Sequence, residues 1–328
     1  MKPVGNLAQD RAPSARLRAG YVPLGIGVAM AIWPLLSGPS YVVYIATIVM
    51  IYVIGALGLH LVLRMGQMSI GHGAFMGIGA YTSTLLVMSA GLPWVLSFVA
   101  AGLLSAAVAA VIGPIILRLR GVFFSLVTFT FGEIVRLAMI EWRGLTGGSP
   151  GIAQVPPPFE AAAQPLPYYY LVLGCAALAF LLVWRILRSD IGNALDSIAV
   201  SDGLAEANGV PTRRLKIAIF VLACGMVGIA GSLQAHFIHF ISPDSYTFKE
   251  SVQFILINVI GGATTIWGPV LGSIFIVAFP EMLRSWVEYQ WLIYGIVLVA
   301  LMAYLPGGLM EVVHKVSRRI KLGTRRDG

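Results

Sequence analysis

The sequence predicts an all-α integral membrane protein, a polytopic bundle of about ten transmembrane helices, some of them broken by glycine or proline. Of the 328 residues, 58% are hydrophobic and only 11% are charged, whereas soluble domains carry roughly 25% charged residues. Apolar runs of the length that spans a bilayer, about 20 residues, recur along most of the chain. Basic residues flank the first and the last of these runs, which is typical of cytoplasmic chain ends.

The order of the elements follows from these apolar runs and from the charges between them. We expect spans at 21–38, 41–60, 71–90, 93–117, 121–141, 166–187, 216–240, 251–265, 268–284 and 290–306. The last long run contains Gly261-Gly262 and Gly268-Pro269, so we divide it into two short spans. The number of crossings is then even, with both basic ends in the cytoplasm. This predicts a basic N-terminal tail (1–20), a transmembrane domain (21–308) and a basic C-terminal tail (309–328).

The same parity assigns sides to the two long polar connections. The connection 189–216 falls in the cytoplasm, together with arginines such as Arg64 and Arg120 at the ends of the neighbouring spans. The connection 142–166, rich in glycine and proline and poor in charge, falls in the periplasm. Because basic residues concentrate in cytoplasmic loops, the two assignments are mutually consistent.

A short helix is predicted inside the connection 189–216. Ser201 or Asp202 can cap its start, Gly209 suits the left-handed position after its end, and Pro211 prevents its continuation. Its small residues would leave a slim surface that a partner's groove can enclose, with one acidic charge. We therefore expect a partner-binding helix, against the alternative of an ordinary solvated loop, and its site residues are Asp202, Gly203, Ala205, Glu206, Ala207 and Gly209.

No motif for chemistry on this chain is visible. A phosphate-binding loop of the G-x-x-x-x-G-K-[ST] type is absent, so hydrolysis of a nucleotide would fall to another chain. His236 and His239 have no third metal ligand beside them, and Cys175 and Cys224 lie in apolar runs. The net charge of +8 follows from membrane topology and carries no basic face interleaved with aromatic residues. We therefore expect no catalytic residue, metal site, bound cofactor or nucleic-acid partner.

Polar and glycine-broken segments at membrane depth indicate a transport pathway. Glycine-interrupted spans in both halves of a transporter point to its substrate route, and intramembrane charges are costly unless they serve a function. The alternatives are tight helix packing at the glycines and a structural ion pair between Glu133 and Arg136. The candidate pathway residues are Gln67, Ser69, Gly71, His72, Thr128, Thr130, Glu133, Gly261 and Gly262.

Several motifs, in order along residues 60–285, resemble those of one family. They are Gly66-Gln67-x-Ser69-x-Gly71-His72, Thr130-Phe131-Gly132-Glu133-Ile134, Thr146-Gly147-Gly148, Ala205-Glu206-Ala207-x-Gly209, Ile241-Ser242-Pro243-Asp244-Ser245 and Trp267-Gly268-Pro269. The chain is thereby similar to the M-type (LivM-like) permeases of branched-chain amino acid ABC importers. It departs from the family at Asn193 and Ala199, where arginines are usual, and at Thr264, where a glycine is usual.

The resemblance implies a function and a set of partners. It implies a bacterial inner-membrane permease paired with a second permease subunit, two ATPase subunits that bind ATP and magnesium, and a periplasmic substrate-binding protein. The helix near Glu206 would be the coupling helix that docks on an ATPase. Leucine, isoleucine and valine are the expected substrates, with related amino acids or amides as alternatives. From the residues alone, an ion- or proton-coupled secondary transporter of small polar solutes remains the alternative function.

Overall fold

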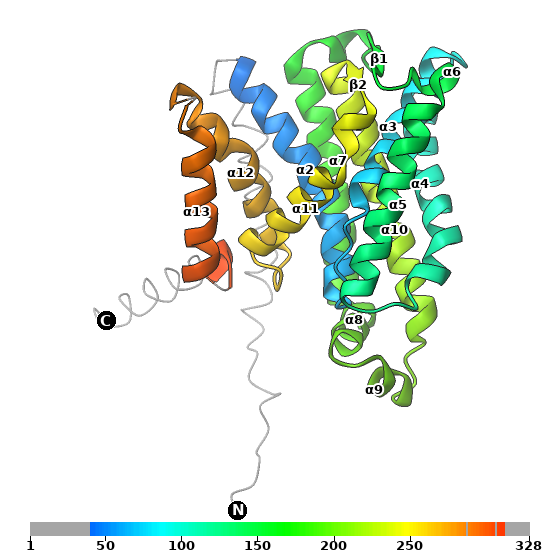
Figure 1. Ribbon diagram of the computed structural model, residues 1–328, viewed down its shortest axis with the longest axis vertical. Coiled ribbons are helices and arrows are strands. Elements are labelled where there is room, and N and C mark those ends of the chain that lie inside the picture. The colour runs from blue at the N-terminus through cyan, green and yellow to red at the C-terminus, as the bar shows by residue number, and fades with distance from the viewer. Residues whose placement is uncertain (1–39, 287, 306, 312–328) are drawn as a thin grey trace, which may run out of the picture.

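The structure, a computed structural model, describes residues 40–286, 288–305 and 307–311. The predicted first span (21–38), the predicted N-terminal tail and most of the predicted C-terminal tail lie outside these residues. The described chain is a bundle of helices with a single two-stranded sheet at one end (Figure 1). The all-α membrane fold class predicted from the sequence is confirmed.

Two helices form the centre of the bundle, α2 (Ser40–Arg64) and α10 (Thr212–Ile238). Residues 49–62 of α2 are all buried. Helix α10 packs on α2, on α3 (His72–Met88) and on α4 (Trp94–Ile116). Glycines permit these crossings: a Cβ atom on Gly231 would lie 1.9 Å from the carbonyl oxygen of Met76. Small residues at helix crossings are what membrane helices use to approach closely.

The remaining long helices surround this centre. Helix α5 (Val122–Glu141) lies against α3 and α4, and α7 (Pro165–Arg188) lies against α2. Helix α11 (Phe248–Gly261) packs on α12 (Trp267–Met282) and on α2. Helix α13 (Gln290–Tyr304) is apolar on all sides and buries no residue against the described part of the chain, which suits a helix surrounded by lipid.

The polar connections gather at opposite ends of the bundle, as Figure 1 shows. One end carries α8 (Asp190–Val200) and α9 (Asp202–Ala207). The other carries α6 (Arg143–Thr146) and the antiparallel pair of β1 (Ile152–Ala153) and β2 (Phe240–Ile241). Short 3₁₀ helices complete the connections: η1 (Glu160–Ala163), η2 (Pro243–Tyr246) and η3 (Arg284–Trp286).

Each predicted span from 41–60 onward corresponds to a helix. Among the described residues, five helices are long and apolar enough to cross a membrane: α2, α4, α5, α7 and α10. Helices α12 and α13 are shorter and apolar. The predicted division of the last long run is confirmed, because α11 ends at Gly261 and α12 begins at Trp267. Gly262 follows the end of α11 with φ of +112°, a backbone conformation that residues with a Cβ atom rarely adopt.

Helix α8 was not predicted. Residues 190–200, expected to be part of a loop, form α8, which buries Gly192, Leu195 and Ile198 against the bundle. These three residues follow one another at a spacing of three, so they share one face of the helix. The stretch mixes apolar residues with four polar ones and, at 11 residues, is too short to span a membrane. For this reason composition alone does not separate it from a solvated connection.

Candidate functional site

Helix α9 has the start and the stop that its sequence predicts. The Oγ of Ser201 accepts a hydrogen bond from the backbone N–H of Leu204 at 3.4 Å, so Ser201 is the cap and Asp202 is the first helical residue. Gly209 adopts φ of +81° after the helix. Pro211 then lies immediately before α10. The result is a short, capped helix between α8 and α10.

The exposed face of α9 combines two small residues with one leucine and one glutamate. Asp202 and Ala205 are buried, whereas Gly203, Leu204 and Ala207 are exposed. A Cβ atom added at Gly203 would meet nothing within 4 Å. Glu206 is exposed too, and its Oε1 accepts a short hydrogen bond from the Oγ1 of Thr212 in α10. The carboxylate predicted to meet a partner therefore also stabilises the turn between the two helices.

Ion pairs fix α8 and α9 to the bundle. In α9, Asp202 pairs with Lys216 of α10 and with Arg120 of the connection between α4 and α5, each at 2.5 Å. In α8, Asp196 pairs with Arg64 at the end of α2, also at 2.5 Å. These contacts confirm that Arg64 and Arg120 lie at the same end of the bundle as the connection 189–216.

Arg64 also reaches the break between α11 and α12. Its Nη1 donates to the backbone carbonyl of Thr264 at 3.1 Å, while its Nη2 pairs with Asp196 of α8. Thr264 stands where a glycine is usual in the family that the sequence resembles. It accepts this bond with its backbone carbonyl oxygen, which any residue at that position would provide. The unusual Ala199 lies close to Gly66, whose added Cβ atom would come within 3.1 Å of the Ala199 Cα atom.

The first group of candidate pathway residues meets where an irregular segment enters α3. Ser69 and His72 are fully buried, and the Ser69 Oγ lies 2.8 Å from the Nδ1 of His72. The backbone N–H of Ile70 donates to the Oγ1 of Thr128 in α5 at 3.0 Å. A Cβ atom on Gly71 would lie 2.5 Å from the carbonyl oxygen of Thr128, so only glycine permits this approach. The segment is thereby joined tightly to α5.

Two buried polar atoms in this group lack a partner within the described part of the chain. They are the Oε1 of Gln67 and the Nε2 of His72. Burial of an unpaired polar group costs about 1–3 kcal/mol. Irregular backbone at membrane depth is tolerated where it lies against protein or lines a water-filled cavity. A crevice too narrow to hold a water molecule lies beside Ile70, between α5 and the start of α11, and is lined by Phe129, Glu133 and Ser251, among others.

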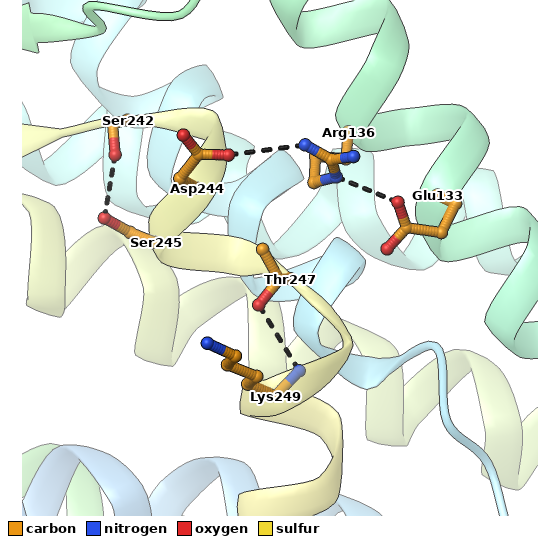
Figure 2. A network of polar contacts seen from close by, with 7 residues as sticks. All are labelled: Glu133, Arg136, Ser242, Asp244, Ser245, Thr247 and Lys249. Atoms are coloured by element: carbon orange, nitrogen blue, oxygen red, sulfur yellow. Dashed lines mark hydrogen bonds and ion pairs between the residues drawn. The ribbon is translucent and has the colours of Figure 1, made fainter.

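Glu133 belongs to a charged cluster that the sequence indicated only in part. Figure 2 shows Arg136 between two carboxylates: its Nε donates to Glu133 at 2.9 Å and its Nη1 to Asp244 of η2 at 3.3 Å. The side chains of Glu133 and Arg136 are 27% and 24% exposed. Thr130, also on α5, is exposed and bonds to the backbone of Leu126. Asp244 is 108 residues from Arg136, so no local pattern joins the two.

The last two candidate pathway residues lie at a different helix junction. A Cβ atom on Gly261 would lie 1.8 Å from the carbonyl oxygen of Gly268, and one on Gly272 would lie 1.9 Å from that of Ile257. The glycines therefore let α11 and α12 pack at backbone contact. Gly262 lies against Gly307, next to α13. The structure thus gives Gly261 and Gly262 a packing role at the base of this helix pair.

The two histidines near the C-terminal end of α10 contact the connection 142–166. The Nδ1 of His236 lies 2.7 Å from the carbonyl oxygen of Pro156, and the Nδ1 of His239 lies 2.8 Å from that of Val155. Ser83 contacts the other ring nitrogen of His236 at 2.9 Å. Across the described residues, no group of three or more His, Cys, Asp or Glu is arranged to hold a metal ion.

Comparison with known proteins relates this chain to transport permeases. A family model described as the permease component of branched-chain amino acid transport systems matches residues 41–303. The high-affinity branched-chain amino acid transport system permease protein LivM of Escherichia coli K12 is 32% identical over 307 residues, covering 85% of this chain and 72% of that protein. LivM of Salmonella typhimurium LT2 matches with the same identity and coverage. The autoinducer 2 import system permease protein LsrC of Salmonella paratyphi B is 27% identical over 201 residues, or 57% of this chain and 56% of that protein. No solved structure matches.

Proposed function

The chain belongs to the permease family of branched-chain amino acid transport systems, and we propose that it is one of two permease subunits of an ATP-driven importer. Two ATPase subunits bind ATP and magnesium on the cytoplasmic side, and a periplasmic binding protein delivers the substrate. Leucine, isoleucine and valine are the substrates, in keeping with the names of the LivM relatives. The protein lies in the bacterial inner membrane, with both termini in the cytoplasm.

The observation that carries this proposal is the geometry of α9. It is a capped and stopped helix that exposes Gly203, Leu204 and Ala207, and it is tied by ion pairs to α10 and to the start of α5. A partner that binds α9 can therefore move the two spanning helices α5 and α10 together. The basic residues Arg64, Arg120 and Lys216 lie at the same end, which supports a cytoplasmic position for α9.

The substrate route in this proposal follows α5 and the start of α3. Glu133, Arg136 and Asp244 form a charged, partly exposed surface at membrane depth, which lipid would not tolerate. Water or the second permease subunit therefore covers this face of α5. The buried pair of Ser69 and His72 lies further along the same helix interface, next to Thr128. Tilting of α5 would open this interface alternately to either side of the membrane.

A charge added to α9 tests the proposal. Gly203→Arg introduces a bulky cation where a side chain meets nothing within 4 Å, so the fold is kept while docking is blocked. The matched control is Asn193→Arg, which adds the same charge to an exposed position of α8 where the family usually has arginine. The complex encoded with this chain is reconstituted in proteoliposomes, and uptake of labelled leucine and co-purification of the ATPase subunits are measured.

We expect Gly203→Arg to abolish both ATP-dependent uptake and co-purification, with little change in the control. Normal uptake by Gly203→Arg would refute the coupling role of α9. Uptake by this chain alone, driven by an ion or proton gradient without ATP, would instead support the secondary-transporter alternative. Leucine uptake that does not compete with isoleucine or valine would correct the assignment of the substrate class.

A further inference from the structure

A single carboxylate on α9 joins the beginnings of two spanning helices. Asp202 is 2.5 Å from the Nζ of Lys216 in the first turns of α10 and 2.5 Å from the Nη2 of Arg120. Arg120 directly precedes Gly121, the residue that caps α5 and adopts φ of +56°. In Figure 1 α9 lies at the lower end of the bundle, beyond the ends of the spanning helices. Asp202 is therefore a junction between α9, α10 and α5.

The two ion pairs of Asp202 differ in their surroundings. The Lys216 side chain is 6% exposed and that of Asp202 is 10% exposed, so this pair is buried. The Arg120 side chain is 65% exposed, so its pair with Asp202 forms at the surface. Loss of one partner from a buried pair leaves an unpaired charge and is strongly destabilising, whereas loss of an exposed partner costs little stability. Lys216 thus holds Asp202 in place, and Arg120 can be removed without unfolding the protein.

Helix α5 is the spanning helix that this surface pair can move. Against the described part of the chain it buries only Phe124, Thr128 and Met139. Gly121 at its start has a positive φ and no atom within 4 Å of an added Cβ, so no neighbouring side chain packs on the residue that follows Arg120. Elements with few buried contacts are those that move most readily. Further along α5, Arg136 contacts Asp244 of η2. A tilt of α5 would therefore change the contacts within the charged cluster.

We propose that Arg120 is a positioning residue that transmits movement of α9 to α5 through Asp202, and so couples ATP hydrolysis to opening of the transport route. The inference rests on the proposed function, since it requires an ATPase that moves α9. Arg120 touches neither substrate nor nucleotide in this scheme. It acts because a shift of Asp202 pulls the residue that precedes the cap of α5.

The test compares transport with ATP hydrolysis in the reconstituted complex. Arg120→Gln removes the ion pair with Asp202, Arg120→Lys keeps a cation there, and Arg118→Gln removes an equal charge from the same connection. Arg118 is exposed and forms no ion pair within the described part of the chain, which makes it the matched control. The readouts are substrate molecules transported per ATP hydrolysed, ATPase co-purification and the thermal midpoint of unfolding.

We expect Arg120→Gln to lower transport per ATP by about fivefold, the factor that an ion pair of about 1 kcal/mol can contribute. ATPase co-purification and thermal stability should stay at the wild-type level, and Arg120→Lys should restore most of the ratio. Arg118→Gln should behave as wild type. An unchanged ratio in Arg120→Gln, an equal loss in Arg118→Gln, or loss of the ATPase from the complex would each overturn the proposal.

Chemical rescue provides a second, independent measurement. The exposed position allows Arg120→Cys to be labelled with a cationic or with a neutral methanethiosulfonate reagent of similar size, while Cys224 is buried and treated wild type controls for Cys175. Only the cationic label should restore transport per ATP, and equal effects of both labels would refute the electrostatic link. If wild-type complex transports nothing with ATP, the proposed function itself fails, which is distinct from failure of this link.

Discussion

The crossing of α3 and α10 makes a quantitative prediction about Gly231. A Cβ atom there would lie 1.9 Å from the carbonyl oxygen of Met76, 2.8 Å from its carbonyl carbon and 3.1 Å from the backbone nitrogen of Ala80. All three atoms belong to the backbone, so no side-chain rotation relieves the overlap. Because real contacts of this kind stay above 3.0 Å, the two helices must separate by about 1 Å in a close-packed core.

Two opposing effects set the magnitude for Gly231→Ala. Replacing glycine by alanine within a helix gains about 1 kcal/mol of helix propensity. Overpacking of a well-packed core costs about 1–3 kcal/mol, and a backbone overlap on this scale belongs at or above the upper end. The net expectation is a loss of about 2 kcal/mol, which lowers the thermal midpoint of a chain of this length by about 3 °C. The matched control is Gly174→Ala in α7, where an added Cβ meets nothing within 4 Å.

Thermal unfolding of the purified protein in detergent, followed by circular dichroism, measures both variants. Gly231→Ala should unfold several degrees below wild type, whereas Gly174→Ala should be unchanged or slightly more stable. Substrate uptake by the complex that carries Gly231→Ala should fall as well, since a shift of α3 displaces His72 from its place beside α5. A Gly231→Ala protein as stable as the Gly174→Ala control would refute the argument that backbone contact holds this crossing together.

Three further outcomes follow from single contacts. Ser201→Ala removes the cap of α9 and should cost about 1 kcal/mol, seen as a lower thermal midpoint that Ser201→Thr restores; equal midpoints for both variants would contradict this. Arg136→Gln leaves Glu133 without its cation at membrane depth and should reduce the yield of folded protein, which the double variant with Glu133→Gln should recover; no recovery would show that the pair acts through something other than charge balance. Arg64→Gln breaks the pair with Asp196 and should reduce uptake without loss of the ATPase, unlike Gly203→Arg, and an uptake equal to wild type would exclude a role for this contact.

Much of the helix arrangement is readable from local sequence. Backbone polar groups in lipid must be paired within the element, so an apolar run of sufficient length has to be a helix. This is why α2, α4, α5, α7 and α10 appear where their apolar runs predict them. The same local logic located the cap and the stop of α9, because Ser201 and Gly209 act on backbone groups a few residues away.

The charged contacts could not be predicted in the same way. The sequence suggested that Glu206 is available to a partner, yet its carboxylate accepts a hydrogen bond from Thr212. It left Ser201 and Asp202 as alternative caps of α9, and the structure shows that Ser201 caps the helix while Asp202 pairs with two cations. Glu133 and Arg136 are an expected pair at a spacing of three, whereas Asp244 joins them from η2. Each of these partners is set by which helix ends meet in space.

The sequence by itself therefore determined the membrane class, the long apolar helices of the described chain, and the presence of a short capped helix among basic residues. These features depend on composition, periodicity and contacts over a few residues. Only the tertiary structure decided that Asp202 ties α9 to α5 and α10, that Arg64 reaches the α11–α12 break, and that Gly231 holds α3 at backbone contact. The physical reason is that ion pairs and backbone contacts act over a few ångströms, between residues that the chain order separates widely.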